Sequence, residues 1–106
     1  MSEFEERRRS PRTEVSIKLP GLGQVQNISA DGMWLLPKNP ISIGTLLNLE
    51  FRPFSGAPLI KCKGEVIWFG HRKIADGRTE AGLKFVDLAE SDRKIILEYV
   101  KSQYQH

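Results

Sequence analysis

The sequence is poor in the residues that build disulfides, metal centres and membrane spans. It has 106 residues, with one cysteine, Cys62, and two histidines, His71 and His106. One cysteine cannot form an internal disulfide, and so few thiol and imidazole groups do not make a zinc cluster. No apolar run approaches the roughly 20 residues that cross a bilayer, and the charged start MSEFEERRR lacks the apolar segment of a signal peptide. We therefore expect a cytoplasmic protein without a metal site or a membrane span.

Catalytic signatures are missing too. The glycines of LPGLGQV, residues 19–25, are not followed by the lysine and helix of a phosphate-binding loop. Ser29 has no sequence signal of a histidine base, and Cys62 falls on a strand face that is predicted to be buried. The net charge of +3 is too small for a protein that coats nucleic acid. These absences favour a binding protein over an enzyme.

The sequence does contain a clear strand pattern. Apolar and polar residues alternate in short segments separated by turn formers, which is typical of antiparallel strands. The pattern predicts strands near residues 13–19, 24–28, 33–36, 47–51, 59–69 and 81–85. On the longest strand one face is predicted to carry Ile60, Cys62, Gly64, Val66 and Trp68. The core is expected to include Ile17, Leu47, Leu49, Val66, Leu83 and Phe85.

The carboxyl end changes to a helical period. Apolar residues at 95, 96, 99 and 100 fall on one stripe, and Ser91 or Asp92 is placed to cap the helix. The pattern predicts a helix near residues 90–104. A chain of this length forms one domain. The expected fold is mainly β: an antiparallel six-stranded β-barrel over about residues 13–86, with the C-terminal helix packed on it or across its mouth.

Two segments remain unexplained by the fold alone. The first is the stretch EERRRSPRTEV, residues 5–15, in which four arginines lie ahead of the first strand. Flanking glutamates nearly cancel their charge, which favours a particular target over a general electrostatic surface. The second is the loop NISADG, residues 27–32. We expect residues 1–12 to form a flexible basic arm and residues 13–106 to form the barrel with its helix.

Together these segments resemble a known family. Residues 8–12 fit the pattern RxxxR, and residues 27–32 fit [D/N]xSxxG. In this order, and on this strand pattern, they are similar to the PilZ domain, whose members are small bacterial β-barrels that bind the second messenger cyclic di-GMP. The strands around residues 66–68 and 82–85 and the closing helix also fall where such domains have theirs. The resemblance therefore covers nearly the whole chain.

The resemblance implies a ligand site and a role for each residue in it. Arginines would pair with the phosphates and stack on or hydrogen-bond to guanine. Asn27 would meet a guanine edge, more weakly than the charged Asp would. The Ser29 hydroxyl would donate to a phosphate or hold the loop, and Gly32 would allow an unusual backbone or a close approach. The implied residues are Arg7, Arg8, Arg9, Arg12, Asn27, Ser29 and Gly32, with Trp68 as a further candidate.

A purely structural alternative stays open for the same residues. The arm could be a solvated tail, and Asn27 and Ser29 could cap a turn in which Gly32 is an ordinary turn glycine. Trp68 could belong to the core or to the barrel surface. Met33 and Trp34 follow the loop directly, so one is expected to line the pocket and the other the interior, but alternation does not say which.

Three functions are compatible with these features. The first is a cyclic di-GMP receptor without a cofactor that signals to a protein partner in trans, through ordering of the arm when the ligand binds. The second is a PilZ-like adaptor with little or no nucleotide affinity. The third is a small barrel that binds single-stranded nucleic acid, for which Trp34, Phe54, Trp68 and Phe69 show no clear spacing of an exposed stacking platform.

Overall fold

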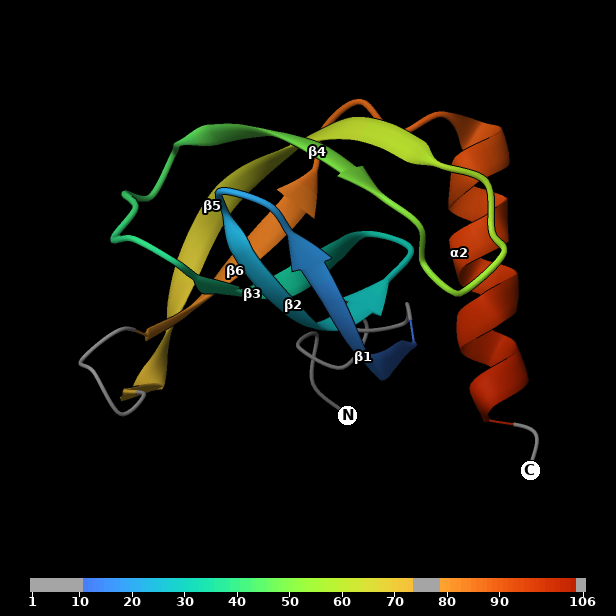
Figure 1. The fold of residues 1–106 in the computed structure, drawn as a ribbon, viewed down its shortest axis with the longest axis horizontal. Helices are drawn as coiled ribbons and strands as arrows, with labels where there is room; N and C mark the ends of the chain where they lie inside the picture. The colour runs from blue at the N-terminus through green and yellow to red at the C-terminus, as the bar shows by residue number, and fades with distance from the viewer. Residues whose placement is uncertain (1–10, 74–78, 105–106) are drawn as a thin grey trace, which may run out of the picture.

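The fold is one curled antiparallel sheet with a helix at its end (Figure 1). The computed structural model describes residues 11–73 and 79–104, and side chains except those of residues 71–73. The elements, in chain order, are β1 (Arg12–Leu19), β2 (Gly23–Ser29), β3 (Gly32–Pro37), β4 (Leu46–Phe51), β5 (Ile60–Lys73), β6 (Thr79–Phe85) and α2 (Glu90–Gln103). The turn predicted at Asp76 and Gly77 lies outside the described residues.

The sheet confirms the predicted six-stranded antiparallel architecture. Its strands run in the order β1-β2-β3-β6-β5-β4, and every neighbouring pair is antiparallel. The edge strands β1 and β4 come into contact across the open side of the curled sheet, as the blue and green ribbons of Figure 1 show. The sheet is therefore a curled half-barrel, with its core on the concave side.

The core contains most of the residues predicted for it. Leu49, Val66, Leu83 and Phe85 are buried, as the alternation predicts. Cys62 is buried as well. Ile17 and Leu47 are only partly buried and pack against the core from outside. Both lie on the edge strands β1 and β4, which have a neighbouring strand on one side only, although the edge position alone does not expose Leu49 of β4.

Helix α2 covers one end of the sheet. Ile96 and Val100 are buried in the core, and the stacked rings of Tyr99 and Phe54, 5.0 Å apart, join the helix to the β4–β5 connection. The predicted cap is wrong: the N-cap is Ala89, without a side-chain hydrogen bond, so neither Ser91 nor Asp92 caps the helix. The first turn instead carries Glu90 and Asp92, whose charges suit the positive end of the helix dipole.

Candidate ligand site

The site is assembled around Arg12, the first residue of β1. Its guanidinium Nη1 donates a hydrogen bond to Asn27 Oδ1 at 2.6 Å. Its Cζ lies 5.4 Å from the centroid of the Trp34 ring, a cation–π distance. The last arginine of the RxxxR pattern therefore meets the first residue of the second pattern. Although the expected arm extends to residue 12, the strand already begins at Arg12.

A β-bulge explains why Asn27 faces Arg12. Val25 points into the core, and simple alternation would send Asn27 inward with it. The β2–β3 register shifts between Val25 and Asn27, so Gln26 is the extra residue and Ile28 becomes the next buried side chain. Bulges re-aim side chains in this way, often beside functional sites. Asn27 thus reaches the outer face of the sheet.

The turn between β2 and β3 is held by Ser29. The Ser29 side chain is buried, and its Oγ accepts hydrogen bonds from the backbone N–H of Asp31 at 3.1 Å and of Gly32 at 3.3 Å. The hydroxyl therefore holds the loop, which is one of the two roles expected for it. Side-chain acceptors of this kind replace the backbone partners that a tight turn lacks.

Gly32 is required by a close approach of two strands. A Cβ at this position would lie 2.0 Å from the carbonyl oxygen of Leu83, which belongs to β6. Gly32 pairs with Lys84 in the β3–β6 ladder, so the obstacle is rigid backbone of the neighbouring strand. Of the two explanations expected for this glycine, close approach is therefore the one that the structure supports.

Two tryptophans extend the outer face beyond Asn27. Asn27 pairs with Trp34, Trp34 pairs with Gly82, and Gly82 pairs with Trp68. The two indole rings lie edge to face, with centroids 5.2 Å apart. The Trp68 ring covers Gly82, where a Cβ would come within 2.4 Å of it. Met33 is fully buried, so Trp34 is the residue of that pair that faces the site.

The predicted orientation of Trp68 is wrong. Trp68 was expected on the same face as Val66, but the β5–β6 register shifts between these residues, and Ile67 is the extra residue. Val66 stays in the core, whereas Trp68 turns to the outer face beside Trp34. This places Trp68 on the same side of the sheet as Asn27.

The structure brings together part of the implied site. Arg12, Asn27, Ser29 and Gly32 lie in contact through β1, β2 and the turn into β3. Arg7, Arg8 and Arg9 lie outside the described residues. Sequence reasoning missed the contact between Arg12 and Trp34, for which the only signal was the position of Trp34 just after the second pattern. It also missed two contacts that no motif marks, those of Arg93 with Asp31 and of Tyr104 with the backbone of Arg12.

The environment of Cys62 disfavours its reactive thiolate form. Burial, followed by the nearby charges of Asp87 and Asp92, raises the pKa of its thiol to about 11. A raised pKa keeps the thiol protonated at neutral and mildly alkaline pH, and the thiolate is the nucleophile. We expect iodoacetamide at pH 8 to alkylate Cys62 at least roughly tenfold more slowly in the native protein than in urea. Equal rates in the two states would contradict this assignment.

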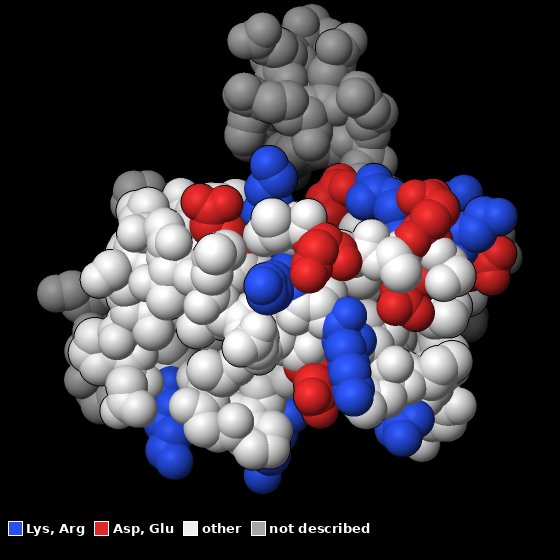
Figure 2. All heavy atoms as spheres, turned by 90° about the horizontal axis from the view of Figure 1, so that it is seen from above, with Lys and Arg blue, Asp and Glu red and all other residues white. Residues whose placement is uncertain are grey.

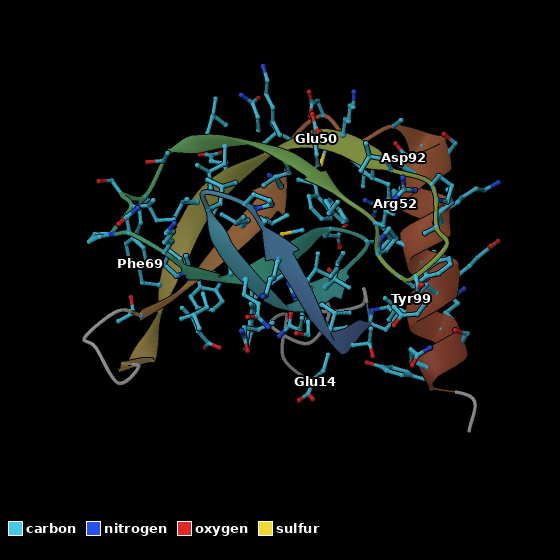
Figure 3. All side chains as sticks on the ribbon, viewed as in Figure 1. Glu14, Glu50, Arg52, Phe69, Asp92 and Tyr99 are labelled. Carbon is cyan, nitrogen blue, oxygen red and sulfur yellow. The ribbon has the colours of Figure 1, made fainter. Side chains whose placement is uncertain are left out.

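A cleft that includes neither Arg12 nor Asn27 lies elsewhere along β1. It has a volume of about 580 Å³ and is lined mainly by residues of β1, the β4–β5 connection and α2, among them Ile17, Lys18, Arg52, Phe54 and Tyr99. Figure 3 shows Arg52 beside α2, Tyr99 on α2 itself, and Phe69 at the opposite end of the sheet. The Arg52 side chain donates to the carbonyl of Ala57. None of the described residues that line this cleft belongs to either sequence pattern.

Nothing among the described residues indicates a metal site or a spanning helix. No group of three or more His, Cys, Asp or Glu side chains in residues 11–70 and 79–104 is arranged to hold a metal ion. In the same part of the chain, no helix has both the length and the apolar character needed to cross a bilayer.

The fold defines a small domain built on a curled, barrel-like antiparallel sheet with a C-terminal helix. Residues 6–102 match the family model described as PilZ domain, and the chain belongs to the PilZ domain family. PilZ domains are binding or adaptor domains, and the family includes receptors for c-di-GMP (cyclic di-GMP). No curated protein matches the chain.

Solved structures share the fold at low sequence identity. The inhibitor of motility from Bacillus subtilis (MotI/DgrA) is 20% identical with a TM-score of 0.75, and the match covers 92% of this chain and 51% of that one. The PilZ domain of YcgR from Escherichia coli, solved with c-di-GMP, is 16% identical with a TM-score of 0.67, and coverage is 93% and 92%. YcgR from Escherichia coli in complex with c-di-GMP is 14% identical with a TM-score of 0.68, and coverage is 93% and 46%. This chain thus spans about half the length of MotI and of that YcgR structure.

Proposed function

We propose that this chain is a bacterial, cytoplasmic cyclic di-GMP receptor that passes the signal to a protein partner in trans. The observation that supports it best is the contact between Arg12 and Asn27, because it joins the two sequence patterns on the outer face of the sheet. Membership of the PilZ domain family and the c-di-GMP in the YcgR structure support the choice of ligand.

Each proposed contact uses the chemistry of its side chain. Planar guanidinium groups suit both a phosphate and the face of a guanine, so Arg12, with Arg7, Arg8 and Arg9 from the arm, would hold phosphates and bases. Asn27 would bind a guanine edge. Ser29 and Gly32 would fix the loop backbone beneath the ligand. Trp68 and Trp34 offer apolar ring surface at the far end of the same row.

The proposed signal is the ordering of residues 1–11 over the sheet. Their only large apolar side chains are those of Met1 and Phe4, so burial offers little to offset the entropy of ordering them. Phosphates of the ligand would supply the missing counter-charge and cover one surface of the domain. In amide relaxation measurements, residues 5–11 should become rigid only when cyclic di-GMP is present. Unchanged relaxation at saturating ligand would remove the arm from the mechanism.

Calorimetric titration with cyclic di-GMP tests the proposed receptor function. We expect saturable binding of cyclic di-GMP and no comparable binding of GTP or of single-stranded DNA. On the face seen in Figure 2, Lys and Arg side chains are interspersed with Asp and Glu and with uncharged residues, so this face offers single-stranded DNA no continuous basic groove. Absence of heat with cyclic di-GMP, at concentrations where the fold is intact, would overturn the receptor assignment.

The adaptor with little nucleotide affinity is the second candidate, and Asn27 favours it. An amide oxygen binds a guanine edge without the charge that strengthens such bonds. We expect Asn27→Asp to tighten cyclic di-GMP binding by roughly threefold to tenfold, because hydrogen bonds to charged groups are about twice as strong. The same calorimetric titration measures this. Weaker binding by the Asp variant would show that Asn27 does not meet a guanine edge.

A further inference from the structure

Both ends of α2 are tied to the candidate ligand site. In the first turns of the helix, Arg93 Nη2 donates to Asp31 Oδ1 at 2.7 Å and Nη1 donates to the carbonyl oxygen of Ala30 at 3.1 Å. At the other end, the hydroxyl of Tyr104 accepts the backbone N–H of Arg12 at 3.1 Å and donates to the carbonyl oxygen of Arg12. One helix therefore holds both sequence patterns.

The helix between these contacts is a fixed spacer. Its middle is anchored in the core by Ile96 and Val100, which are fully buried. At about 1.5 Å per residue, the helical stretch from residue 93 to its end at residue 103 is roughly 15 Å long. Figure 1 shows α2 standing along the end of the sheet near the start of β1, and the helix contacts both β1 and β2.

We propose that Arg93 and Tyr104 are positioning residues of the ligand site. The proposal rests on the proposed function and adds that α2 sets the distance between Arg12 and the loop of residues 29–32. Tyr104 fixes the backbone from which the Arg12 guanidinium extends, and Arg93 fixes the loop that carries Ser29 and Gly32. By thermodynamic linkage, a ligand that needs this arrangement also strengthens both contacts.

The contacts set geometry more than they stabilise the fold. The Arg93–Asp31 ion pair is about half exposed, with side-chain exposures of 41% and 50%, and exposed pairs contribute little to stability. Tyr104 is 61% exposed. Removing either contact should therefore leave the melting temperature nearly unchanged and still reduce ligand affinity. A structural role would lower both together.

The test is calorimetric titration of two variants with cyclic di-GMP, each beside a matched control. Tyr104→Phe removes one hydroxyl, and Tyr99→Phe removes the same group from the same helix while keeping the ring stacked on Phe54. Arg93→Ala is paired with Lys94→Ala, which removes the same charge one residue away. We expect affinity to fall about threefold to tenfold in Tyr104→Phe and in Arg93→Ala, as for the loss of one modest contact, and to change less than about twofold in the controls.

Hydrogen exchange of the ligand-free protein separates this proposal from the receptor assignment. Tyr104→Phe should speed exchange of the Arg12 amide, and Tyr99→Phe should not. Unchanged exchange at Arg12 would overturn the proposal whether or not the ligand binds. Faster exchange with no binding by the wild-type protein would instead overturn the receptor assignment. Faster exchange with equal affinity in all variants would show that α2 holds Arg12 without positioning it for the ligand.

Discussion

Arg12→Ala should weaken cyclic di-GMP binding more than the removal of any other side-chain contact in the described part of the site. The variant loses a charge-assisted contact of roughly 1.5 to 3 kcal/mol, which is about ten- to a hundredfold in the dissociation constant. The fold should persist, because the Arg12 side chain lies on the outer face of an edge strand and contacts Asn27 and Trp34 there, away from the core. Calorimetry measures the affinity, and thermal melting checks the fold.

Two further variants of β1 make this result specific. Arg12→Lys keeps the charge but loses the planar fork of donors, so it should also bind weakly. Lys18→Ala removes one positive charge from an exposed position of the same strand and should bind as the wild type does. If Arg12→Ala and Lys18→Ala bound the ligand equally well, Arg12 would have no part in the site.

Gly32→Ala should destabilise the protein and abolish ligand binding at the same time. The added methyl group would lie 2.0 Å from the Leu83 carbonyl oxygen, and no side-chain rotation can relieve contact with a neighbouring strand. Overpacking of this kind costs roughly 1 to 3 kcal/mol, and we expect the upper part of that range. Urea denaturation measures the loss of unfolding free energy. Gly32 is the first residue of β3, and its backbone N–H donates to Ser29 Oγ. A shift of β3 at Gly32 therefore also shifts the turn that Ser29 holds.

Gly70→Ala is the matched control for Gly32→Ala. Gly70 also lies within a strand, β5, but a Cβ there would meet Glu80 no closer than 3.4 Å, which is ordinary contact. This variant should keep nearly the wild-type stability and affinity. Equal stability of the two alanine variants would contradict the close approach of β3 and β6 at Gly32.

The alternation of apolar and polar residues predicted the strands, because the core side chains follow it. The positions of the β-bulges, where the alternation is interrupted, could not be predicted in this way. Gln26 and Ile67 are each an extra residue in one strand of a pair, and nothing in their chemistry marks a bulge. Each bulge reverses the faces of the residues that follow it, so Asn27 and Trp68 both turn outward. The incomplete closure between β1 and β4 also depends on long-range curvature, which no local pattern encodes.

The candidate site, like the fold, could be predicted only where a local sequence pattern marks it. Arg12, Asn27, Ser29 and Gly32 belong to two short patterns, so a resemblance could point to them before any geometry was known. Trp34, Arg93 and Tyr104 carry no such pattern. Tyr104 reaches Arg12 from 92 residues away, and Arg93 reaches Asp31 from 62 residues away. Contacts of this kind come from the packing of α2 against the sheet.

A nuclear magnetic resonance titration of the wild-type protein with cyclic di-GMP tests the central claim, that the two sequence patterns form one ligand site. We expect the largest amide shifts to fall at Arg12, Asn27 and Gly32, on the outer face of the sheet. Large shifts confined to Ile17, Arg52 and Tyr99, around the separate cleft, or no shifts at saturating ligand, would contradict it.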